Sequence, residues 1–464
     1  MTEKKQDSSR RDFLKTSTKL SVAGAAASSL VTPGLSLARS AHAFGTDTIR
    51  LGLIGCGGRG TGAAIQAMNT EGNVELHSMA DAFGNRLEGS FNACKNKHND
   101  KVKAADNTKY VGFDAYKRVL DSDVDMVILA TPPGFRPLHF ESAIEAGKHV
   151  FMEKHVAVDA PGVRRVLKAG EVAKEKNLAV AVGLQRRHER AYRQVMERLK
   201  DGAIGDLVYS RAYWNGGGVW TRPREEGQTE LEYQMRNWYY FNWLCGDHIT
   251  EQHIHNLDVI NWLLDDYPEK GQGQGGRLVR TGIDNGEIYD HHLVEFTYPN
   301  GHKMYSHCRH QPNCWNSVSE HVHGTKGYCN ISSGEIFNES GERIYKADGS
   351  RGGHQQEHHD LFADIRNGII PNEAEYGAKS TMTSILGRLC TYTGKELRWE
   401  DAINSNVSLC DVDALADMKA DEAPVKPDEN GRYEIMMPGK PGVIDWKPGR
   451  KKAAKKKKAT QGKK

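Results

Sequence analysis

Short apolar runs alternate with amphipathic stretches through the first half of the chain, from Thr48 to about residue 187. The runs that we expect to form strands are 49–54, 74–80, 123–131, 149–153 and 178–183. Helices are expected between them at 58–70, 84–97, 137–147 and 160–176. The run at 123–131 (DVDMVILAT) is almost continuously apolar, which is typical of a strand buried on both faces of a parallel sheet. The alternation predicts a doubly wound α/β domain over residues 48–187.

After residue 188 the pattern changes to aromatic clusters and strand-like alternation. Helices are expected at 189–201, at about 249–264, at 355–368 and at 376–394, with a strand at 206–214. Residues 276–340 are typical of several antiparallel strands separated by turns such as Pro299-Asn300-Gly301. We therefore expect a second α/β domain over 188–403 with a mostly antiparallel sheet, followed by an extended arm over 404–449.

The net charge of +3 conceals an acidic body between two basic ends. Residues 450–464 carry nine Lys or Arg and no acid, and residues 1–43 carry a net charge of +4, which leaves −10 for the part between them. An acidic body argues against nucleic-acid binding by the folded domains. The basic tail over 450–464 is most simply a solvated, disordered end, and an anionic partner in the cell envelope is the alternative.

The first 43 residues are typical of an export signal. The twin arginine Arg10-Arg11 precedes Asp12-Phe13-Leu14-Lys15, a Gly/Ala-rich stretch follows from Leu20 to Ala38, and Ala41-His42-Ala43 is a small-x-small cleavage site. The weak hydrophobicity of that stretch favours the twin-arginine (Tat) export machinery over an ordinary secretory signal. We therefore expect an exported protein of the periplasm or cell envelope. That route carries folded proteins, so it suits a protein that binds its cofactor before export.

The eight cysteines form no C-x-x-C pair, so a zinc site built on paired cysteines is not expected. Export permits disulfide bonds, and Cys308 and Cys314 are the only cysteines that lie close together in the sequence. The sequence leaves open whether that disulfide bond forms.

A glycine-rich turn follows the first expected strand directly. The hexapeptide GCGGRG fits the G-x-G-x-x-G pattern between a strand and a helix. Gly55 allows the tight turn, Gly57 lets the backbone approach a pyrophosphate, and Gly60 packs the helix on the strand. Asp81 ends the second strand 21 residues after Gly60, where its carboxylate can accept the ribose hydroxyl groups. The pattern predicts a bound dinucleotide and favours NAD over NADP, with Arg86 expected to be a surface cation.

The strand at 149–153 ends in Glu153-Lys154, at the carboxyl edge of the predicted sheet where ligands of such folds bind. A lysine that is shielded from water at this edge can act as a general acid or base. A structural surface pair between the two side chains is the alternative.

Three stretches together carry a family resemblance: the glycine-rich turn, residues 129–159 (LATPPGFRPLHFESAIEAGKHVFMEKHVAVD) and residues 249–264 (ITEQHIHNLDVINWLL). In that order the chain resembles the Gfo/Idh/MocA family of glucose-fructose oxidoreductase and inositol 2-dehydrogenase, over about residues 48–400. The resemblance implies a Rossmann domain joined to an α/β domain with a large open sheet for substrate binding and oligomerisation. It also implies hydride transfer between NAD(P) and a sugar or cyclitol carbon, and we expect a homo-oligomer.

The resemblance also implies catalytic residues. The family's Glu-Lys-Pro motif corresponds to Glu153-Lys154-His155, which keeps the lysine and replaces the proline. The family's Asp-x-x-x-His pair corresponds to Glu251 and His255, with a carboxylate that is one methylene longer. Cys245-Gly246-Asp247 stands where the family has glycines. Lys154, Glu251 and His255 are therefore the expected catalytic residues.

Helical spacing points to the same residues. His248, Glu251, His255 and Asp258 are separated by steps of three, four and three, which places them on one face of the expected helix. Such a face could bind a metal ion. We favour a proton relay in which Lys154 or His255 takes the hydroxyl proton of the substrate and Glu251 holds the imidazole tautomer.

Further residues are expected to bind cofactor and substrate. The cofactor is expected to contact Gly55, Gly57, Gly58, Arg59, Gly60, Asp81, Thr131, Pro132, His139, Glu153 and Lys154. The substrate is expected to contact Lys154, Arg187, Trp238, Glu251 and His255. Arg187 fits a structural role at the start of a helix equally well. Trp238 opens the aromatic run WYYFNW, which either stacks against a sugar ring or packs in the core.

Together these features predict an exported NAD-dependent oxidoreductase that transfers a hydride between nicotinamide and a carbinol carbon of a sugar or cyclitol. Two alternatives remain open: a redox-neutral glycosidase or lyase that oxidises its sugar transiently, and a sugar-binding protein without turnover. Outside the cytoplasm there is no pool of soluble NAD. We therefore expect the cofactor to be tightly bound and to be restored within each catalytic cycle.

Overall fold

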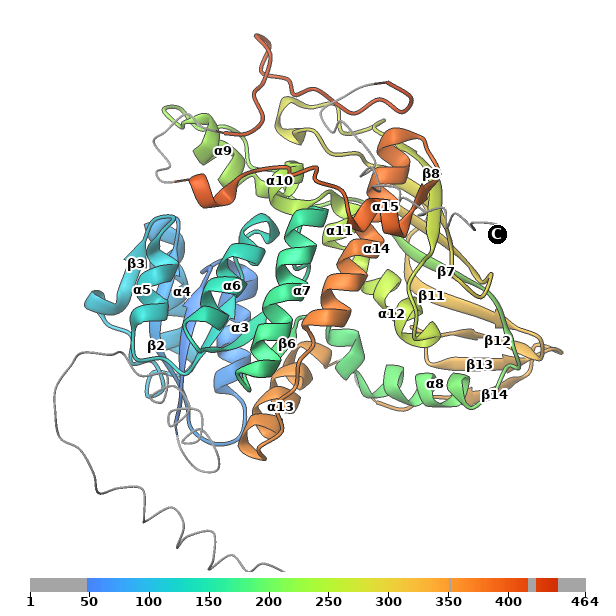
Figure 1. The fold of residues 1–464 in the computed structure, drawn as a ribbon, viewed down its shortest axis with the longest axis horizontal. Helices are drawn as coiled ribbons and strands as arrows, with labels where there is room; N and C mark the ends of the chain where they lie inside the picture. The colour runs from blue at the N-terminus through green and yellow to red at the C-terminus, as the bar shows by residue number, and fades with distance from the viewer. Residues whose placement is uncertain (1–47, 350–351, 416–422, 441–464) are drawn as a thin grey trace, which may run out of the picture. The chain divides into compact units, whose positions relative to one another are not determined.

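The computed structural model describes residues 48–349, 352–415 and 423–440 (Figure 1). One compact unit contains all of them. The expected signal peptide (1–43) and basic tail (450–464) lie outside the described residues, as does part of the expected arm (404–449). Within the described ranges, no helix is both long enough and apolar enough to cross a membrane.

Six parallel strands form the first sheet, in the order β3-β2-β1-β4-β5-β6. The strands are β1 (Ile49–Ile54), β2 (Val74–Asp81), β3 (Lys109–Val111), β4 (Met126–Leu129), β5 (His149–Met152) and β6 (Val180–Val182). Every residue of β4 is buried, as its continuous apolar run predicts. The strand is shorter than 123–131, and Asp123 and Asp125, which precede it, form ion pairs with Arg50. The order is that of a doubly wound Rossmann sheet, so the predicted fold class is confirmed for this domain.

The helices of the Rossmann domain connect these parallel strands. They are α3 (Gly58–Met68), α4 (Gly84–Lys97), α5 (Ala115–Asp121), α6 (Arg136–Glu145) and α7 (Ala160–Glu175). Helix α7 begins after Asp159, whose side chain accepts a hydrogen bond from the backbone N–H of Gly162 and caps the helix. The sequence pattern does not predict β3 or α5, because elements of three and seven residues are too short to show a period.

The second sheet has nine strands in the order β14-β13-β12-β11-β7-β10-β9-β8-β15. The strands are β7 (Leu207–Gly216), β8 (Lys270–Gly276), β9 (His291–Thr297), β10 (Lys303–His310), β11 (Ser317–Gly324), β12 (Gly327–Asn330), β13 (Glu335–Asn338), β14 (Arg343–Lys346) and β15 (Leu397–Arg398). Only β7 and β10 pair in parallel; the other described pairings in this sheet are antiparallel. The prediction of a large, mostly antiparallel sheet in the second domain is therefore confirmed.

The chain after residue 188 also forms helices, some of which contact the Rossmann domain. They are α8 (Arg190–Lys200), α9 (Glu230–Arg236), α10 (Asn242–Cys245), α11 (His248–Glu251), α12 (Ile254–Leu264), α13 (Gly353–Arg366), α14 (Ala374–Thr393) and α15 (Trp399–Ile403). Short 3-10 turns are η1 (Asp106–Thr108), η2 (Pro133–Phe135), η3 (Gln185–His188), η4 (Trp238–Tyr240), η5 (Ile283–Asn285) and η6 (Val412–Ala414). Helix α14 packs on α7 and α12, and α13 returns to pack on α3, so the two domains share an interface (Figure 1).

The single helix expected at 249–264 is wrong, because the chain forms two helices, α11 and α12, with a break at Gln252 and His253. Both side chains at the break turn toward strand β10: Gln252 Oε1 lies 2.8 Å from the His310 ring, and His253 Nε2 lies 2.8 Å from Ser306 Oγ. These polar contacts tie the break to the sheet, and a new helix begins at Ile254. Residues before and after the break therefore do not share one helix face.

The eight cysteines are all free thiols. Cys308 is buried on β10, whereas Cys314 is exposed in the following loop. The question that the sequence left open is answered, because the structure contains no Cys308–Cys314 disulfide bond.

A buried histidine links the end of the Rossmann sheet to the last helices. His188 Nδ1 lies 2.7 Å from Asp360 Oδ2, and its Nε2 lies 3.5 Å from Glu373 Oε1. Burial lowers the pKa of His188, but the hydrogen bonds to the two carboxylates outweigh burial and raise the pKa to about 9. The protonated imidazole therefore stabilises the fold below pH 6.5, and this contribution is lost as the pH rises through about 9.

We predict that His188→Gln lowers the free energy of unfolding by about 1–3 kcal/mol at pH 6, because the charge that pairs with the two carboxylates is removed. The difference from the wild type should shrink as the pH approaches 9, in urea unfolding followed by circular dichroism. The control is His359→Gln on α13, the helix that carries Asp360, because His359 has no ion pair among the described residues. A deficit that stays constant from pH 6 to pH 9.5 would contradict the ion-pair explanation.

Candidate active site

The glycine-rich turn between β1 and α3 is shaped by steric contact. Gly55 has a φ of +98°, and a Cβ on it would lie 2.5 Å from the backbone of Ala130. A Cβ on Gly60 would lie 2.0 Å from the Gly55 carbonyl oxygen, so helix and turn can approach only through a glycine. Gly57 and Gly58, in contrast, have open space where a Cβ would be. This open backbone is the surface that a dinucleotide pyrophosphate would contact.

Asp81 lies at the carboxyl end of β2, beside this turn. Its two oxygens accept hydrogen bonds from the backbone N–H groups of Cys56 (2.6 Å) and Phe83 (2.8 Å). Burial raises the pKa of Asp81, and these two hydrogen bonds together with Arg86 and Arg236 oppose the rise. These contacts fix the orientation of the carboxylate, and the side chain also lines a cavity.

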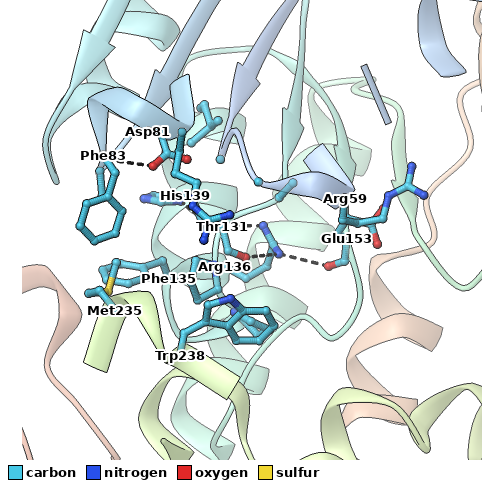
Figure 2. A pocket seen from close by; sticks show the side chains of 18 of the residues that line it. Arg59, Asp81, Phe83, Thr131, Phe135, Arg136, His139, Glu153, Met235 and Trp238 are labelled. Atoms are coloured by element: carbon cyan, nitrogen blue, oxygen red, sulfur yellow. Dashed lines mark hydrogen bonds and ion pairs between the residues drawn. The ribbon is translucent and has the colours of Figure 1, made fainter. Parts of the chain in front are cut away.

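A cavity of about 490 Å³ opens along the carboxyl edge of the first sheet (Figure 2). The predicted site residues that line it are Gly55, Gly57, Gly58, Arg59, Asp81, Thr131, Pro132, His139, Glu153, Lys154, Trp238 and Glu251. Three predicted site residues, Gly60, Arg187 and His255, are not among the lining residues. The structure thus brings most of the expected cofactor and catalytic residues into one cavity.

Lys154 and Glu251 meet at one end of this cavity. The Lys154 ammonium donates hydrogen bonds to Glu251 Oε1 at 2.8 Å and to the Glu251 carbonyl oxygen. The two side chains are only 14% and 13% exposed, so the pair is largely shielded from water. Lys154 follows β5 of the Rossmann domain and Glu251 ends α11 of the second domain. The ion pair therefore forms only when the two domains are packed together.

Glu153 lies behind Lys154 and is held by arginines. Its Oε1 lies 2.9 Å from Arg59 Nε, and its carbonyl oxygen accepts a hydrogen bond from Arg136. Burial raises the pKa of Glu153, and the charges of Arg59, Lys154 and Arg136 oppose that rise. The peptide bond between Lys154 and His155 is cis. The structural-pair alternative for Glu153-Lys154 does not hold, because each side chain pairs with a different partner.

Thr131 and His139 also line the cavity, and Thr131 lies beside Gly55 of the glycine-rich turn. His139 Nδ1 lies 3.1 Å from Thr131 Oγ1, and the Thr131 carbonyl oxygen accepts a hydrogen bond of 2.7 Å from Arg136. Burial, with the nearby Arg136 charge, lowers the pKa of His139 to about 3. The ring is therefore neutral at physiological pH and presents no charge to a ligand.

His255 and Arg187 take up positions away from the cavity lining. His255 is buried and its ring stacks on Trp214, with centroids 6.1 Å apart. Burial and the Lys154 charge hold the pKa of His255 well below its usual range. Arg187 makes two hydrogen bonds of 2.8 Å to Asp258 and lies over the Tyr376 ring, which is the structural role that the sequence left open.

These contacts show that the predicted proton relay, in which Glu251 holds the His255 tautomer, is wrong. Among the described residues, Glu251 bonds to Lys154 and has no hydrogen bond to His255. The break in the helix separates the two residues. Glu251 ends α11 and contacts Lys154 of the Rossmann domain, whereas His255 belongs to α12. The prediction of one shared helix face for His248, Glu251, His255 and Asp258 is therefore wrong as well.

His248 belongs to a separate buried cluster with Asp247 and His292, whose ligand-type atoms lie within 4.8 Å of one another. The Asp247 carboxylate accepts hydrogen bonds from the backbone N–H groups of His248 and Tyr289 and from the Tyr392 hydroxyl. These donors occupy the lone pairs that a metal ion would need, so the cluster reads as a hydrogen-bonded core.

Several residues that line the cavity are absent from the sequence-based set. They are Phe83, Arg86, Phe113, Tyr116, Phe135, Arg136, Trp220, Arg222, Met235 and Arg236. Arg86, expected to be a surface cation, lines the cavity. Phe83 and Arg136 stand next to recognised motifs, so proximity in sequence could have indicated them. Residues 220–236 carry no such signal, because only folding brings them over the Rossmann edge.

The aromatic run at Trp238 divides between the two roles left open. Trp238 lines the cavity, whereas Tyr239, Tyr240, Phe241 and Trp243 are buried in a core cluster. The run therefore contributes the Trp238 ring to the cavity, and its buried aromatic rings hold that segment in the core.

Comparisons with known proteins agree with this geometry. Residues 49–184 match the oxidoreductase family with an NAD-binding Rossmann fold, and residues 192–330 match the GFO/IDH/MocA C-terminal domain. Together the two matches span more than half of the chain. The chain belongs to the Gfo/Idh/MocA oxidoreductase family. The predicted enzyme class, an NAD(P)-dependent oxidoreductase acting on CH–OH groups, is confirmed.

Curated relatives in this Gfo/Idh/MocA family include inositol dehydrogenases. Inositol 2-dehydrogenase from Rhizobium meliloti is 26% identical over 285 residues, which cover 60% of this chain and 74% of that protein. Inositol 2-dehydrogenase from Salmonella typhimurium is 26% identical over 221 residues, which cover 47% of this chain and 55% of that protein. The chain thus matches about three quarters of the first relative and about half of the second.

Solved structures of the family share the fold. Scyllo-inositol dehydrogenase from Lactobacillus casei, with bound NAD(H) and scyllo-inositol, aligns with a TM-score of 0.58 at 20% identity. The alignment covers 76% of this chain and 99% of that chain. Aldose-aldose oxidoreductase from Caulobacter crescentus aligns with a TM-score of 0.59 at 16% identity and covers 76% and 100% of the two chains.

The position of Asp81 leads to a prediction on cofactor choice. Asp81→Asn, which keeps one acceptor oxygen, and Asp81→Ala, which keeps none, should weaken NAD binding progressively. The full loss should be about 10- to 100-fold, the usual worth of hydrogen bonds to a charged group. NADP binding should fall less, because its 2′-phosphate no longer faces a carboxylate. Titration calorimetry with both nucleotides measures the two affinities, and unchanged NAD affinity in Asp81→Ala would remove Asp81 from the site.

Proposed function

We propose that this protein transfers a hydride between NAD and a carbinol carbon of a cyclitol or sugar, with Lys154 moving the hydroxyl proton. The single observation that carries the proposal is the position of the Lys154–Glu251 pair in the same cavity as the glycine-rich turn and Asp81. The names of its relatives support the substrate class, because two of them act on inositol and a solved neighbour binds scyllo-inositol with NAD(H).

The residues fit a nicotinamide dinucleotide. Gly57 and Gly58 leave open backbone for the pyrophosphate, and Asp81 offers its carboxylate to the adenosine ribose. A nicotinamide bound at the Lys154 end would supply the hydride acceptor for oxidation of a CH–OH group. We favour NAD over NADP because the 2′-phosphate of NADP would face the Asp81 carboxylate.

The chain's own residues handle the proton. In its neutral amine form, Lys154 Nζ accepts the hydroxyl proton when an alcohol is oxidised, and the resulting ammonium returns it in the reverse direction. Glu251, at 2.8 Å, stabilises the ammonium form and fixes its direction. Trp238 offers an aromatic face for the apolar side of a sugar or cyclitol ring, and neutral His139 adds no charge to the pocket. His255 takes no direct part in the proton transfer in this proposal. It lies close enough to Lys154 for the charge of that lysine to lower the His255 pKa.

Turnover tests the assignment of Lys154. Lys154→Ala should lower turnover by about 10²–10⁴-fold, the usual worth of a positioned acid–base group, while nucleotide binding persists. Lys154→Arg should be nearly as slow, because the guanidinium keeps the ion pair but does not release its proton. Reduction of NAD is followed by absorbance with a panel of cyclitols and aldoses, and Lys174→Ala on the surface serves as the control. Full activity in Lys154→Ala, or no oxidation of any compound in the panel, would refute the proposal.

We propose further that the protein works outside the cytoplasm after export by the Tat machinery. The support is the Arg10-Arg11 motif and the Ala41-His42-Ala43 site in the sequence. In that location a dissociated cofactor would be lost, so the proposal includes tight binding of NAD. It also includes restoration of the cofactor within each cycle, either by oxidation of one substrate and reduction of another or by oxidation and re-reduction of the same molecule.

We also propose a homo-oligomer formed through the outer face of the second sheet. That face carries the exposed apolar side chains of Leu293 on β9 and Tyr305 on the neighbouring strand β10, which are 45% and 40% exposed. Exposed apolar side chains gathered on one sheet face are typical of a surface that another protein covers.

Native mass spectrometry of protein purified from its own compartment checks both proposals. We expect about one NAD(H) for each chain, a mass of two or more chains, and turnover without added nucleotide, because a cofactor that cannot be replaced must travel with the enzyme. Protein purified without bound nucleotide and active only in excess NAD would contradict tight binding. A monomer at micromolar concentration would contradict the oligomer.

A further inference from the structure

The cavity is closed on one side by a segment of the second domain. Residues 219–241, here called the cap segment, connect β7 to α10 and include α9 and η4. The cap segment contributes Trp220, Arg222, Met235, Arg236 and Trp238 to a lining otherwise made largely by the Rossmann domain. Figure 2 shows Met235 beside Phe135, with Phe83 above them and Trp238 below, and all four residues line the cavity. The cofactor cavity is therefore built by both domains.

Arg236 reaches the end of the cavity where Asp81 lies. Its guanidinium lies 4.1 Å from the centre of the Phe83 ring, across the boundary between the domains. The backbone N–H of Phe83 is bonded to Asp81, and the Arg236 charge opposes the rise in the Asp81 pKa. Glu232, one turn earlier on α9, lies 3.2 Å from Arg236 Nε and directs the side chain. Arg236 is thus placed beside the residue that is expected to hold the adenosine ribose.

The cap segment is anchored from behind. Gln234 is fully buried, donates a hydrogen bond of 2.7 Å to the Val425 carbonyl oxygen and accepts one of 2.7 Å from the Trp243 indole. Asn237 is also fully buried and donates to the Asp284 carbonyl oxygen at 2.8 Å. Residues at the back of α9 therefore hold it against the second domain, while Arg236 projects into the cavity from its C-terminal end.

The charge of the cavity suits a polyanion. Its lining contains six Lys or Arg and three Asp or Glu, although the chain between its two basic ends has a net charge of −10. Arg59 and Lys154 are paired with Glu153 and Glu251, so the excess positive charge comes from the other arginines. A planar guanidinium beside an aromatic ring is also a suitable partner for the flat face of adenine.

We propose that Arg236 is a cofactor-binding residue contributed by the second domain, and that it closes the adenosine end of the site over bound NAD. The inference rests on the proposed function, because it requires a dinucleotide in this cavity. With Arg236 in contact with the adenosine, the nucleotide is held between the two domains. Release then requires the anchored cap segment to move or the guanidinium to leave its position, which makes dissociation slow.

The chain offers a matched control for this test. Arg224 belongs to the same segment, lies 4.1 Å from the centre of the Tyr233 ring and pairs with Glu230. It makes the same kinds of contact as Arg236 but is not among the residues that line the cavity. A loss caused only by weakening α9 would appear in both variants.

Arg236→Ala should speed the release of NAD about 5- to 30-fold, the range expected when a cation–π contact shielded from water is lost. Arg236→Lys should fall between Arg236→Ala and the wild type, and Arg224→Ala should match the wild type. The release rate of NADH is measured by its fluorescence after dilution into excess NAD, for the full chain of each variant. Thermal melting without nucleotide checks that the variants are folded.

Three results would overturn the inference: a wild-type release rate in Arg236→Ala, an equal acceleration in Arg224→Ala, or no NAD binding by the wild type. The last result would refute the proposed function as well, so the two failures can be told apart. Lys154→Ala provides a second separation, because it should lose turnover with its nucleotide still bound.

Discussion

The ion pair between Lys154 and Glu251 is the contact on which the arrangement of the site depends. It joins the carboxyl edge of the Rossmann sheet to the short helix α11 of the second domain, and both side chains are largely shielded from water. Burying two charges is costly, and the cost is offset only when the partners meet with good geometry. The pair therefore favours one relative placement of the two domains. In that placement the glycine-rich turn, Asp81 and the lysine share a single cavity.

Arginines hold the rest of the carboxyl edge in place. Arg59, from the turn that would hold the pyrophosphate, pairs with Glu153, while buried Arg136 donates to the carbonyl oxygens of Glu153 and Thr131. These contacts link the turn after β1 to the strand ends of β4 and β5. A shift of the turn would therefore also move Lys154, because Lys154 follows Glu153 directly in the chain. The site is preorganised by neighbouring charges rather than by its own reacting groups.

The chain modifies the family pattern where its second domain meets the lysine. The longer carboxylate of Glu251 reaches Lys154 from a helix that ends early, and the imidazole of His255 remains behind it against Trp214. Asp247, at a position where the family has glycine, accepts hydrogen bonds from several buried donors and anchors the start of α11. The Asp247 side chain therefore caps the start of the short helix that carries Glu251.

The sequence by itself determined the Rossmann domain, the antiparallel second sheet and the residues on consecutive strand ends. These features follow from local patterns: buried strands are continuously apolar, a tight turn needs glycine, and a strand end places its next residue at the edge of the sheet. Tertiary structure decided the break at Gln252, the partner of Glu251 and the structural role of Arg187. It also decided that Trp220 and Arg236 reach a cavity made largely by residues about a hundred positions earlier in the chain. Those outcomes depend on contacts between segments far apart in sequence, and no local period encodes which distant side chain a polar group will meet.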